Sequence, residues 1–219
     1  MVRRSRKPWI GLLAAACTLA AIPIAGAVTN QAPGALPPPV AGKTVNAKVR
    51  AGTVRYRLPG ASAFVVLTAP TQVPIGTTFD TTAGRVTLTS AADDQGGTQH
   101  AWFYEGTFTL GQTTGAKPVT TLALAGALPQ CGSGRAAAAA GKRKQRHLWG
   151  DGKGRFRTSG RFASATVRGT RWVVIDRCDG TLVRVVRGTV TVRDRLRNKT
   201  IIVREGQEYL VRAPKSATP

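Results

Sequence analysis

Acidic residues, histidine and cysteine are scarce in this chain, which has ten Asp or Glu, two His and three Cys among 219 residues. The sequence contains no HExxH, no nucleophile elbow, no CxxC and no distinctive pair of carboxylates. These patterns are typical of metalloproteases, α/β-hydrolases, zinc and thiol-redox sites, and carboxylate acid/base pairs. The sequence therefore predicts no catalytic residue, no metal site and no cofactor, and we expect a protein that is not an enzyme.

Helix signals are also nearly absent after the first 28 residues. The one candidate is the Ala-rich segment 135–144, which has a glycine and a run of cations but no apolar face, so we interpret it as a linker. Short segments rich in β-branched and aromatic residues, separated by Gly, Pro or Asp, predict strands instead. The predicted strands are 45–49, 53–58, 64–68, 85–89, 100–105, 107–110, 119–124, 165–168, 171–176, 182–187, 189–193, 200–204 and 208–211.

This spacing predicts an all-β fold, a β-roll, barrel or sandwich of short antiparallel strands. Turns and Gly-Thr steps follow one another in the same order in the two halves of the chain. Gly106-Thr107 and Gly188-Thr189 are the clearest equivalent steps, each between two alternating runs. We interpret this order as an internal duplication that gives two units of one kind.

The N-terminus is typical of a secretory signal peptide. Four cations in residues 1–7 precede the apolar stretch 9–28, and Ala25-Gly26-Ala27 is a small-residue cleavage pattern. We expect export with cleavage after Ala27. Two alternatives stay open, because the apolar stretch is long enough to remain as a membrane anchor and Cys17 could carry a lipid. In each case the rest of the chain is extracytoplasmic, secreted or associated with the cell envelope, and only the N-terminal segment would contact a membrane.

Changes in composition along the chain predict five segments. We expect a signal peptide or anchor at 1–27, a Pro/Gly-rich linker at 28–43, a first β unit at 44–127, a basic flexible linker at 128–147 and a second β unit at 148–214.

Two cysteines remain outside the signal sequence, Cys131 and Cys178. An even pair in an exported chain favours a disulfide, here closing a loop of 46 intervening residues. Such a bridge would stabilise the fold by roughly 2 to 4 kcal/mol. The alternative is two unpaired buried thiols.

The second half resembles a known family. It contains Val167-Arg168-Gly169-Thr170 followed by Trp172, then the turn Asp179-Gly180, then Gly188 in a strand pair, and finally Gly206 before a glutamine. In this order the residues resemble the FecR-type domain over about 149–214, and 43–126 is similar to a diverged second copy. The V-R-G-T step followed by an aromatic residue is the most specific part of the resemblance.

The resemblance implies a β-rich extracytoplasmic domain. In the founding members of the family this domain senses the state of an outer receptor and passes it to a cytoplasmic sigma-regulating segment. Only about seven residues precede the apolar stretch here, so we expect no such segment. We therefore expect an exported, FecR-like binding or sensing module of the cell envelope. The alternative that the family suggests is an accessory of transmembrane signalling that contacts a receptor protein.

The net charge of +22 is concentrated in the second half, where twenty Lys or Arg against six Asp or Glu follow Gly141. On the predicted strands many cations alternate with apolar residues, which places them on a solvated face. Arg forks match oxyanions, so we expect this face to bind an anionic envelope polymer or lipid headgroups. The candidate anion-binding residues are Arg184, Arg187, Arg193, Arg195 and Arg197. The alternative is a solvated surface that only protects strand edges.

Two further readings are disfavoured by the sequence. Export and the absence of a helix-turn-helix, zinc-finger or RRM pattern argue against a nucleic-acid partner, despite the basic composition. Trp102, Trp149 and Trp172 are predicted to pack in the core or in strand pairs rather than to form a carbohydrate platform.

The disulfide can be tested on the exported protein. Peptide mapping without reduction should give one linked pair of peptides that contain Cys131 and Cys178 and separate on reduction. Free-thiol labelling of both cysteines in the native protein would contradict the prediction.

Overall fold

The described part of the chain consists of β-strands and turns and contains no helix. A computed structural model describes residues 35–128, 145–167 and 169–214, and Leu36–Pro219 forms one compact unit. Within these ranges there is no helix that could cross a membrane. The predicted all-β fold class is confirmed.

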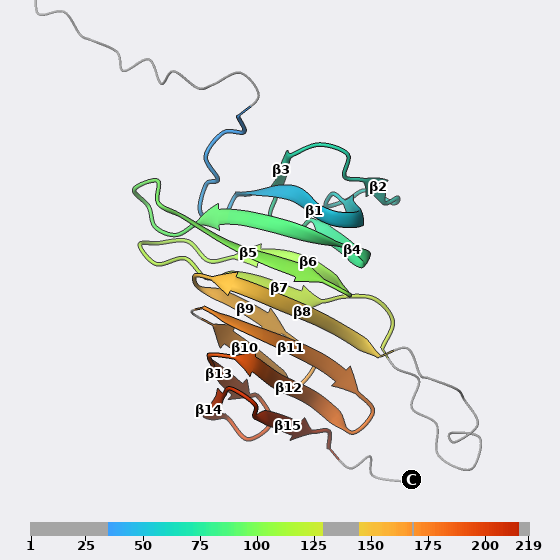
Figure 1. Ribbon diagram of the computed structural model, residues 1–219, viewed down its shortest axis with the longest axis vertical. Coiled ribbons are helices and arrows are strands. Elements are labelled where there is room, and N and C mark those ends of the chain that lie inside the picture. Colours follow the sequence, from blue (N-terminus) through green and yellow to red (C-terminus); the bar gives the residue numbers. More distant parts are fainter. Residues whose placement is uncertain (1–34, 129–144, 168, 215–219) are drawn as a thin grey trace, which may run out of the picture. The chain divides into compact units, whose positions relative to one another are not determined.

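The described residues of this unit form fifteen strands (Figure 1). The first half supplies β1 (Thr44–Arg57), β2 (Val65–Val66), β3 (Thr71–Pro74), β4 (Thr78–Ala91), β5 (Thr98–Tyr104), β6 (Thr107–Gln112) and β7 (Thr120–Leu124). The second half supplies β8 (Arg146–Lys153), β9 (Phe156–Ser159), β10 (Ala163–Val167), β11 (Thr170–Arg177), β12 (Gly180–Arg187), β13 (Thr189–Asp194), β14 (Lys199–Arg204) and β15 (Glu208–Arg212).

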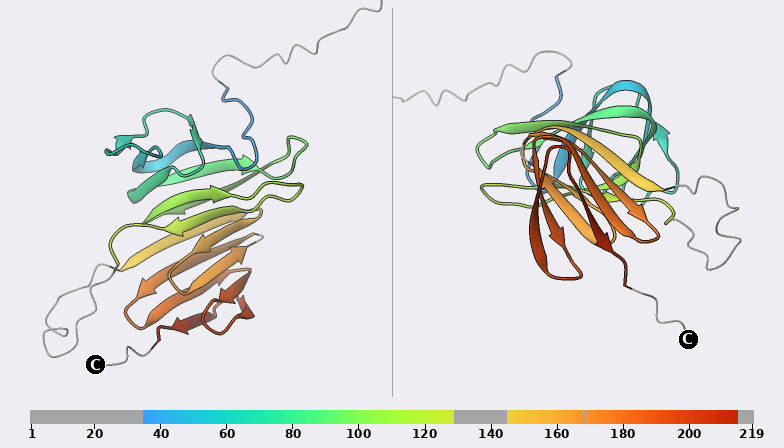
Figure 2. Two further views of the ribbon diagram at one scale, coloured as in Figure 1. Left: turned by 180° about the vertical axis from the view of Figure 1, so that it is seen from behind. Right: turned by 60° about the horizontal axis from the view of Figure 1, so that its bottom comes forward.

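The strands form one sheet that folds over on itself as a flattened, nearly closed barrel. Its path runs β14-β13-β10-β9-β7-β6-β4-β5-β8-β11-β12-β15, with β1 paired along β4. Because β4 pairs with β6 through Thr78–Asp80 and with β5 through Arg85–Ala91, it passes from one layer to the other. We call β5, β8, β11, β12 and β15 the front layer, and β6, β7, β9, β10, β13 and β14 the back layer (Figures 1 and 2).

Glycines mark the places where the chain leaves one layer for the other. Gly106 separates β5 from β6, Gly169 separates β10 from β11, Gly188 separates β12 from β13, and Gly206 separates β14 from β15. Gly188 and Gly206 have φ angles of 84° and 74°, which favour glycine because it has no Cβ. Three of the four glycines in the FecR-like pattern therefore lie at corners between the layers, and the fourth, Gly180, lies at the β11–β12 hairpin.

The two layers enclose one hydrophobic core to which both halves of the chain contribute. A connected series of rings runs through it, with centroid separations of 5.6 to 6.1 Å: Phe79, Phe108, Phe103, Phe156 and Trp172. Trp172 is fully buried and donates a hydrogen bond from Nε1 to Thr158 Oγ1 at 3.0 Å. Its indole lies against Gly150, where a Cβ would come within 2.4 Å of the ring. Burial of such rings is the largest favourable contribution to a core of this kind.

The halves of the chain are also joined by backbone pairing. β5 pairs with β8 in the front layer, antiparallel, and β7 pairs with β9 in the back layer, parallel. The two predicted units thus share one sheet and one core. Their predicted origin by duplication stays a prediction.

Most predicted strands are present, and the differences have local causes. The segments 45–49 and 53–58 belong to one long strand, β1, which continues through bulges at Val49/Ala51 and Thr53/Arg55. β3, β8 and β9 were missed because β3 ends in a proline, β8 contains two glycines and β9 is only four residues long. The linker candidate 135–144 and Cys131 lie outside the described residues.

The corner at Gly106 gives a test of the fold. A Cβ at this position would lie 2.0 Å from the backbone oxygen of His147, so Gly106→Ala must push the corner away from β8. We expect it to lower the free energy of unfolding by about 1–3 kcal/mol, measured by urea denaturation. Gly111→Ala is the control, since a Cβ there would make only ordinary van der Waals contacts, with Thr121 Cβ at 3.7 Å and the Thr121 backbone oxygen at 3.8 Å. Equal stability of the two variants would contradict the close packing of β8 on this corner.

Candidate anion-binding groove

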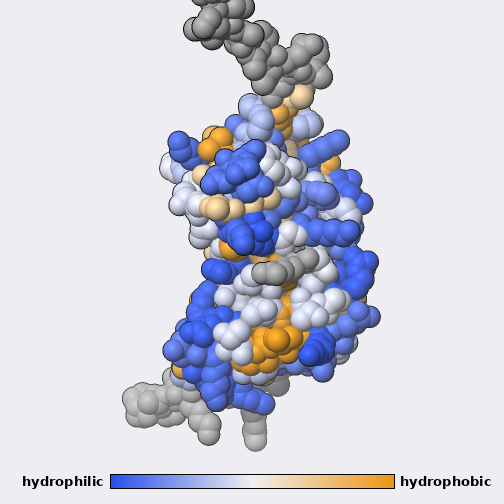
Figure 3. All heavy atoms as spheres, turned by 90° about the vertical axis from the view of Figure 1, so that its left-hand side faces the viewer, coloured by the Kyte–Doolittle hydropathy of each residue, from blue (hydrophilic) through white to orange (hydrophobic). Residues whose placement is uncertain are grey.

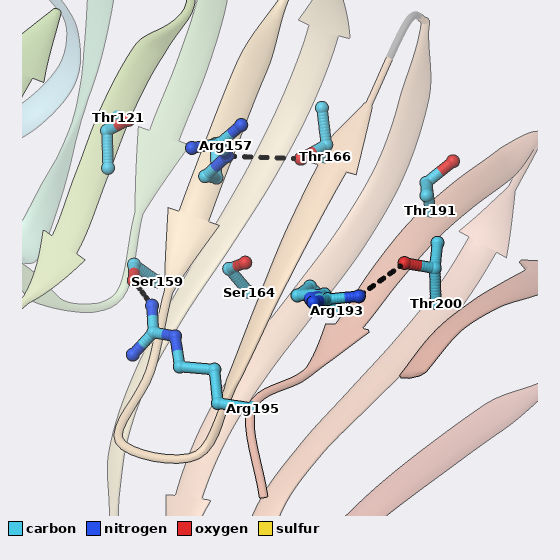
Figure 4. A pocket seen from close by; sticks show the side chains of 9 residues that line it. All are labelled: Thr121, Arg157, Ser159, Ser164, Thr166, Thr191, Arg193, Arg195 and Thr200. Atoms are coloured by element: carbon cyan, nitrogen blue, oxygen red, sulfur yellow. Dashed lines mark hydrogen bonds between the residues drawn. The ribbon is translucent and has the colours of Figure 1, made fainter. Parts of the chain in front are cut away.

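A groove of about 600 Å³ lies on the outer face of the back layer (Figure 4). Its lining consists of three arginines and six serine or threonine residues from β7, β9, β10, the β13–β14 hairpin and β14. They are Arg157, Arg193, Arg195, Thr121, Ser159, Ser164, Thr166, Thr191 and Thr200. None of the nine is acidic and none is a large apolar residue, so the polar side-chain groups of the groove are guanidinium groups and hydroxyls.

Strand alternation produces this lining. Phe156 and Thr158 of β9 point into the core, which leaves Arg157 and Ser159 on the outer face. On β13 the buried residues Val190 and Val192 alternate in the same way with outward residues of the groove. The inward residues fix the register, and the register sets the outward ones side by side.

Neutral oxygen atoms hold the three guanidinium groups. Arg157 Nε donates to Thr166 Oγ1 at 3.3 Å, and Arg193 NH1 donates to Thr200 Oγ1 at 3.2 Å (Figure 4). Arg193 also donates to the carbonyl and side-chain oxygens of Asn198. Arg195 donates to the carbonyl oxygen of Gly160 at 3.0 Å and to the hydroxyl of Ser159.

No carboxylate of the described residues compensates the positive charge of these arginines. All ten acidic residues of the chain lie in the described ranges, and the ion pairs found there include none with Arg157, Arg193 or Arg195. A guanidinium has five N–H donors, and the neutral contacts use only some of them. The groove can therefore offer further donors, with three positive charges, to an anion.

The other predicted anion-binding residues lie elsewhere and have acidic partners. Arg184, on β12 of the front layer, pairs with Glu208 at 2.9 Å, and Arg187 pairs with Asp151 at 3.1 Å. Arg197 pairs with Asp194 at 3.0 Å. Of the five candidates the structure thus brings only Arg193 and Arg195 into the groove. Arg157 was missed, although the alternation Phe-Arg-Thr-Ser of β9 could have indicated it.

Asp194 organises the hairpin that carries Arg193 and Arg195. Its carboxylate is fully buried and accepts hydrogen bonds from the backbone N–H groups of Leu196 and Arg197, from the Arg197 guanidinium and from Tyr209 Oη. Burial alone would raise the pKa of Asp194, but the Arg197 and Tyr209 hydrogen bonds outweigh it and hold the pKa below its usual value. Burial, together with the hydrogen bond to Asp194, raises the pKa of Tyr209.

The front layer has aromatic residues on its outer face, but arginines cover them. The guanidinium carbon of Arg50 lies 3.8 Å from the ring centroid of Trp102, and that of Arg85 lies 4.1 Å from that of Tyr104. Tyr104 also stacks on Trp149 and accepts hydrogen bonds from Arg171, which raise the pKa of that guanidinium. These cation–π and stacking contacts leave no open ring platform at this position.

The remaining motif residues have structural roles where they are described. Val167 and Thr170 are buried beside the β10–β11 corner, and the Thr170 hydroxyl is the one buried side-chain polar atom in the described ranges without a hydrogen bond. Asp179 pairs with Arg177 across the β11–β12 turn, next to Cys178. Arg168 and Cys131 lie outside the described residues, so the predicted disulfide stays a prediction. Within the described ranges no group of three or more His, Cys, Asp or Glu residues could hold a metal ion.

The Asp194 cluster predicts a dependence of stability on pH. Because the folded-state pKa is lowered, the ionised carboxylate stabilises the fold above the unfolded-state pKa, about 3.9, and this contribution is lost as the pH falls through the lower folded-state value. We expect Asp194→Asn to lower the free energy of unfolding by about 1–3 kcal/mol at neutral pH. Urea denaturation should show this difference shrinking below about pH 4. A constant difference from pH 7 to pH 3 would show that charge is not the cause.

Comparison with known proteins gives no further constraint, since no protein-family model, no curated protein and no solved structure matches this chain. The resemblance to the FecR-type domain therefore rests on the quoted residues alone.

Proposed function

We propose that this chain is an exported, non-enzymatic binding or sensing module of the cell envelope that binds an anionic envelope polymer through the groove on the back layer. The observation that carries the proposal is the set Arg157, Arg193 and Arg195, three cations that share one groove with no acidic residue in its lining. The FecR-like residues and the signal-like N-terminus support a function outside the cytoplasm, which is an expectation from the sequence.

The chemistry of the lining suits oxyanions. A guanidinium presents a planar fork of donors that matches carboxylate or phosphate oxygens, and it stays charged at every physiological pH. The serine and threonine hydroxyls between the arginines can donate to anionic oxygens and accept from ligand hydroxyls. A ligand with both groups would therefore satisfy the whole lining.

The surplus of cations strengthens this binding at a distance. The net charge of +22 includes four cations in residues 1–7, so +18 remains after the expected cleavage, and this charge attracts polyanions to the protein. The uncompensated charge of the groove acts on a ligand bound there. Contacts of this kind are screened by salt. Binding should therefore weaken steeply as the salt concentration rises through the physiological range.

Apolar docking to a receptor protein is the alternative function. Large hydrophobic side chains are exposed in the described ranges at scattered positions, among them Val65, Val66, Val186 and Ile202. On the side of the unit seen in Figure 3, hydrophobic surface forms limited patches between hydrophilic residues. Recognition through such patches would survive moderate salt, which separates this alternative from the polyanion proposal.

The proposal predicts the effect of removing the groove charges. The variant Arg157→Ala/Arg193→Ala/Arg195→Ala should lose at least about tenfold in affinity for isolated cell envelopes, about 1.4 kcal/mol or more. The control is Arg184→Ala/Arg187→Ala/Arg212→Ala, which removes the same charge from outside the groove. Binding would be measured by co-sedimentation across a salt series, with bound proteins identified by mass spectrometry.

The results of this experiment distinguish the groove proposal from a total-charge effect and from the receptor alternative. Salt-sensitive binding that only the groove variant loses supports the proposal. Equal losses in both variants would mean that total charge, and not the groove, is responsible. Retention of one stoichiometric protein partner at high salt would replace the proposal with the receptor alternative.

A further inference from the structure

The groove is one end of a longer row of side chains that crosses the whole back layer. Each pair of neighbours in this row is set by the strand register: Arg57↔Thr78, Thr78↔Thr109, Thr109↔Ala123, Ala123↔Ser159, Ser159↔Ser164, Ser164↔Arg193 and Arg193↔Thr200. Register partners lie on the same face of a sheet. The row therefore runs across eight strands on one face, from β14 to β1.

Small side chains fill the row between two arginines. Arg193 lies near one end and Arg57 at the other, and the five residues between them are serine, threonine or alanine. Strands are spaced at about 4.8 Å, so the row is about 34 Å long. At its middle Ala123 is exposed, and the Thr78 and Thr109 hydroxyls are hydrogen-bonded to each other at 2.9 Å.

Acidic side chains do not interrupt the row. The nearest on β4 is Asp80, which is paired with Thr107 in the adjacent row of the back layer. Its carboxylate accepts hydrogen bonds from the backbone N–H and the hydroxyl of Thr82. The row thus combines a cationic groove, a series of hydroxyls and methyls, and a second cation.

The geometry points to a linear acidic polysaccharide as the ligand, lying across the strands from the groove toward Arg57. This inference rests on the proposed function and names its substrate class. Carboxylates of the polymer would meet the arginines, and the sugar hydroxyls between them would meet the hydroxyls of Ser159 and Thr109, since Thr78 and Ser164 are buried. A polymer that carries a charge on every unit and no hydroxyls would leave that polar lining without partners.

Chain length and a mid-row charge test the inference. The probes are linear oligogalacturonates, one set shorter than half the row and one set longer than it, titrated by calorimetry against the Val28 to Pro219 protein. Long oligomers should bind at least about tenfold more tightly than short ones, because the second contact is intramolecular. Ala123→Glu should remove most of that gain, so that long oligomers lose more affinity than short ones, which feel only the added charge beside the groove. Val186→Glu, an exposed position on the front layer, is the matched control.

The outcomes distinguish this inference from the proposed function. If Ala123→Glu leaves long oligomers unaffected while the triple groove variant still loses binding, the row is not used and the groove proposal stands. Tighter binding of linear polyphosphate than of oligogalacturonate of equal length would overturn the polysaccharide assignment. If no polyanion binds the wild-type protein, both proposals fail. Thermal unfolding of each variant would check that it folds.

Discussion

The structure depends on one constraint, that every strand must give its inward side chains to a single core between two layers of sheet. The rings of Phe103, Phe156 and Trp172 meet in that core, although they come from β5, β9 and β11. Their packing fixes the register of strands from both halves of the chain. Since side chains alternate along a strand, the same packing determines which residues reach the outer faces. The groove on the back layer is therefore a consequence of how the core is built.

The scarcity of acidic residues gives the outer faces their character. Among the residues that the structure describes, five carboxylates pair with arginines, at Asp151, Asp176, Asp179, Asp194 and Glu208. Asp176 and Asp194 are buried and fix the turns or strand ends around them, while the pairs of Asp179 and Glu208 are exposed and contribute little to stability. With so few acids, their positions decide which cations stay uncompensated. Apart from Asp80 on β4, they lie on the front layer, at turns and at strand ends, and none lies in the lining of the groove on the back layer.

The fold class and the corners could be predicted from the sequence, because both depend on local patterns. Alternating β-branched residues indicate strands, and a glycine such as Gly188 indicates a place where the backbone must turn sharply. Two strand pairings could not be predicted in this way, the parallel pairing of β7 with β9 and the pairing of β5 with β8. Strands so distant in sequence are brought together by the packing of the whole core. From the alternation of residues alone, Arg184 and Arg193 are both predicted to bind an anion. Only the register shows that Glu208 lies opposite the first and Ser164 opposite the second.

The groove is built on paired strands and not on long loops, and this affects how it can bind. A free arginine side chain has about 2 kcal/mol of rotamer entropy to lose on binding. Here Arg157 and Arg193 already rest on threonine hydroxyls, and the buried Asp194 holds the hairpin from which Arg195 reaches the groove. Part of the side-chain entropy that binding would otherwise remove is therefore already lost on folding, before a ligand binds. Because the partners are neutral, this ordering leaves the charge intact, whereas a carboxylate in the same place would order the arginines and cancel the attraction that they exert.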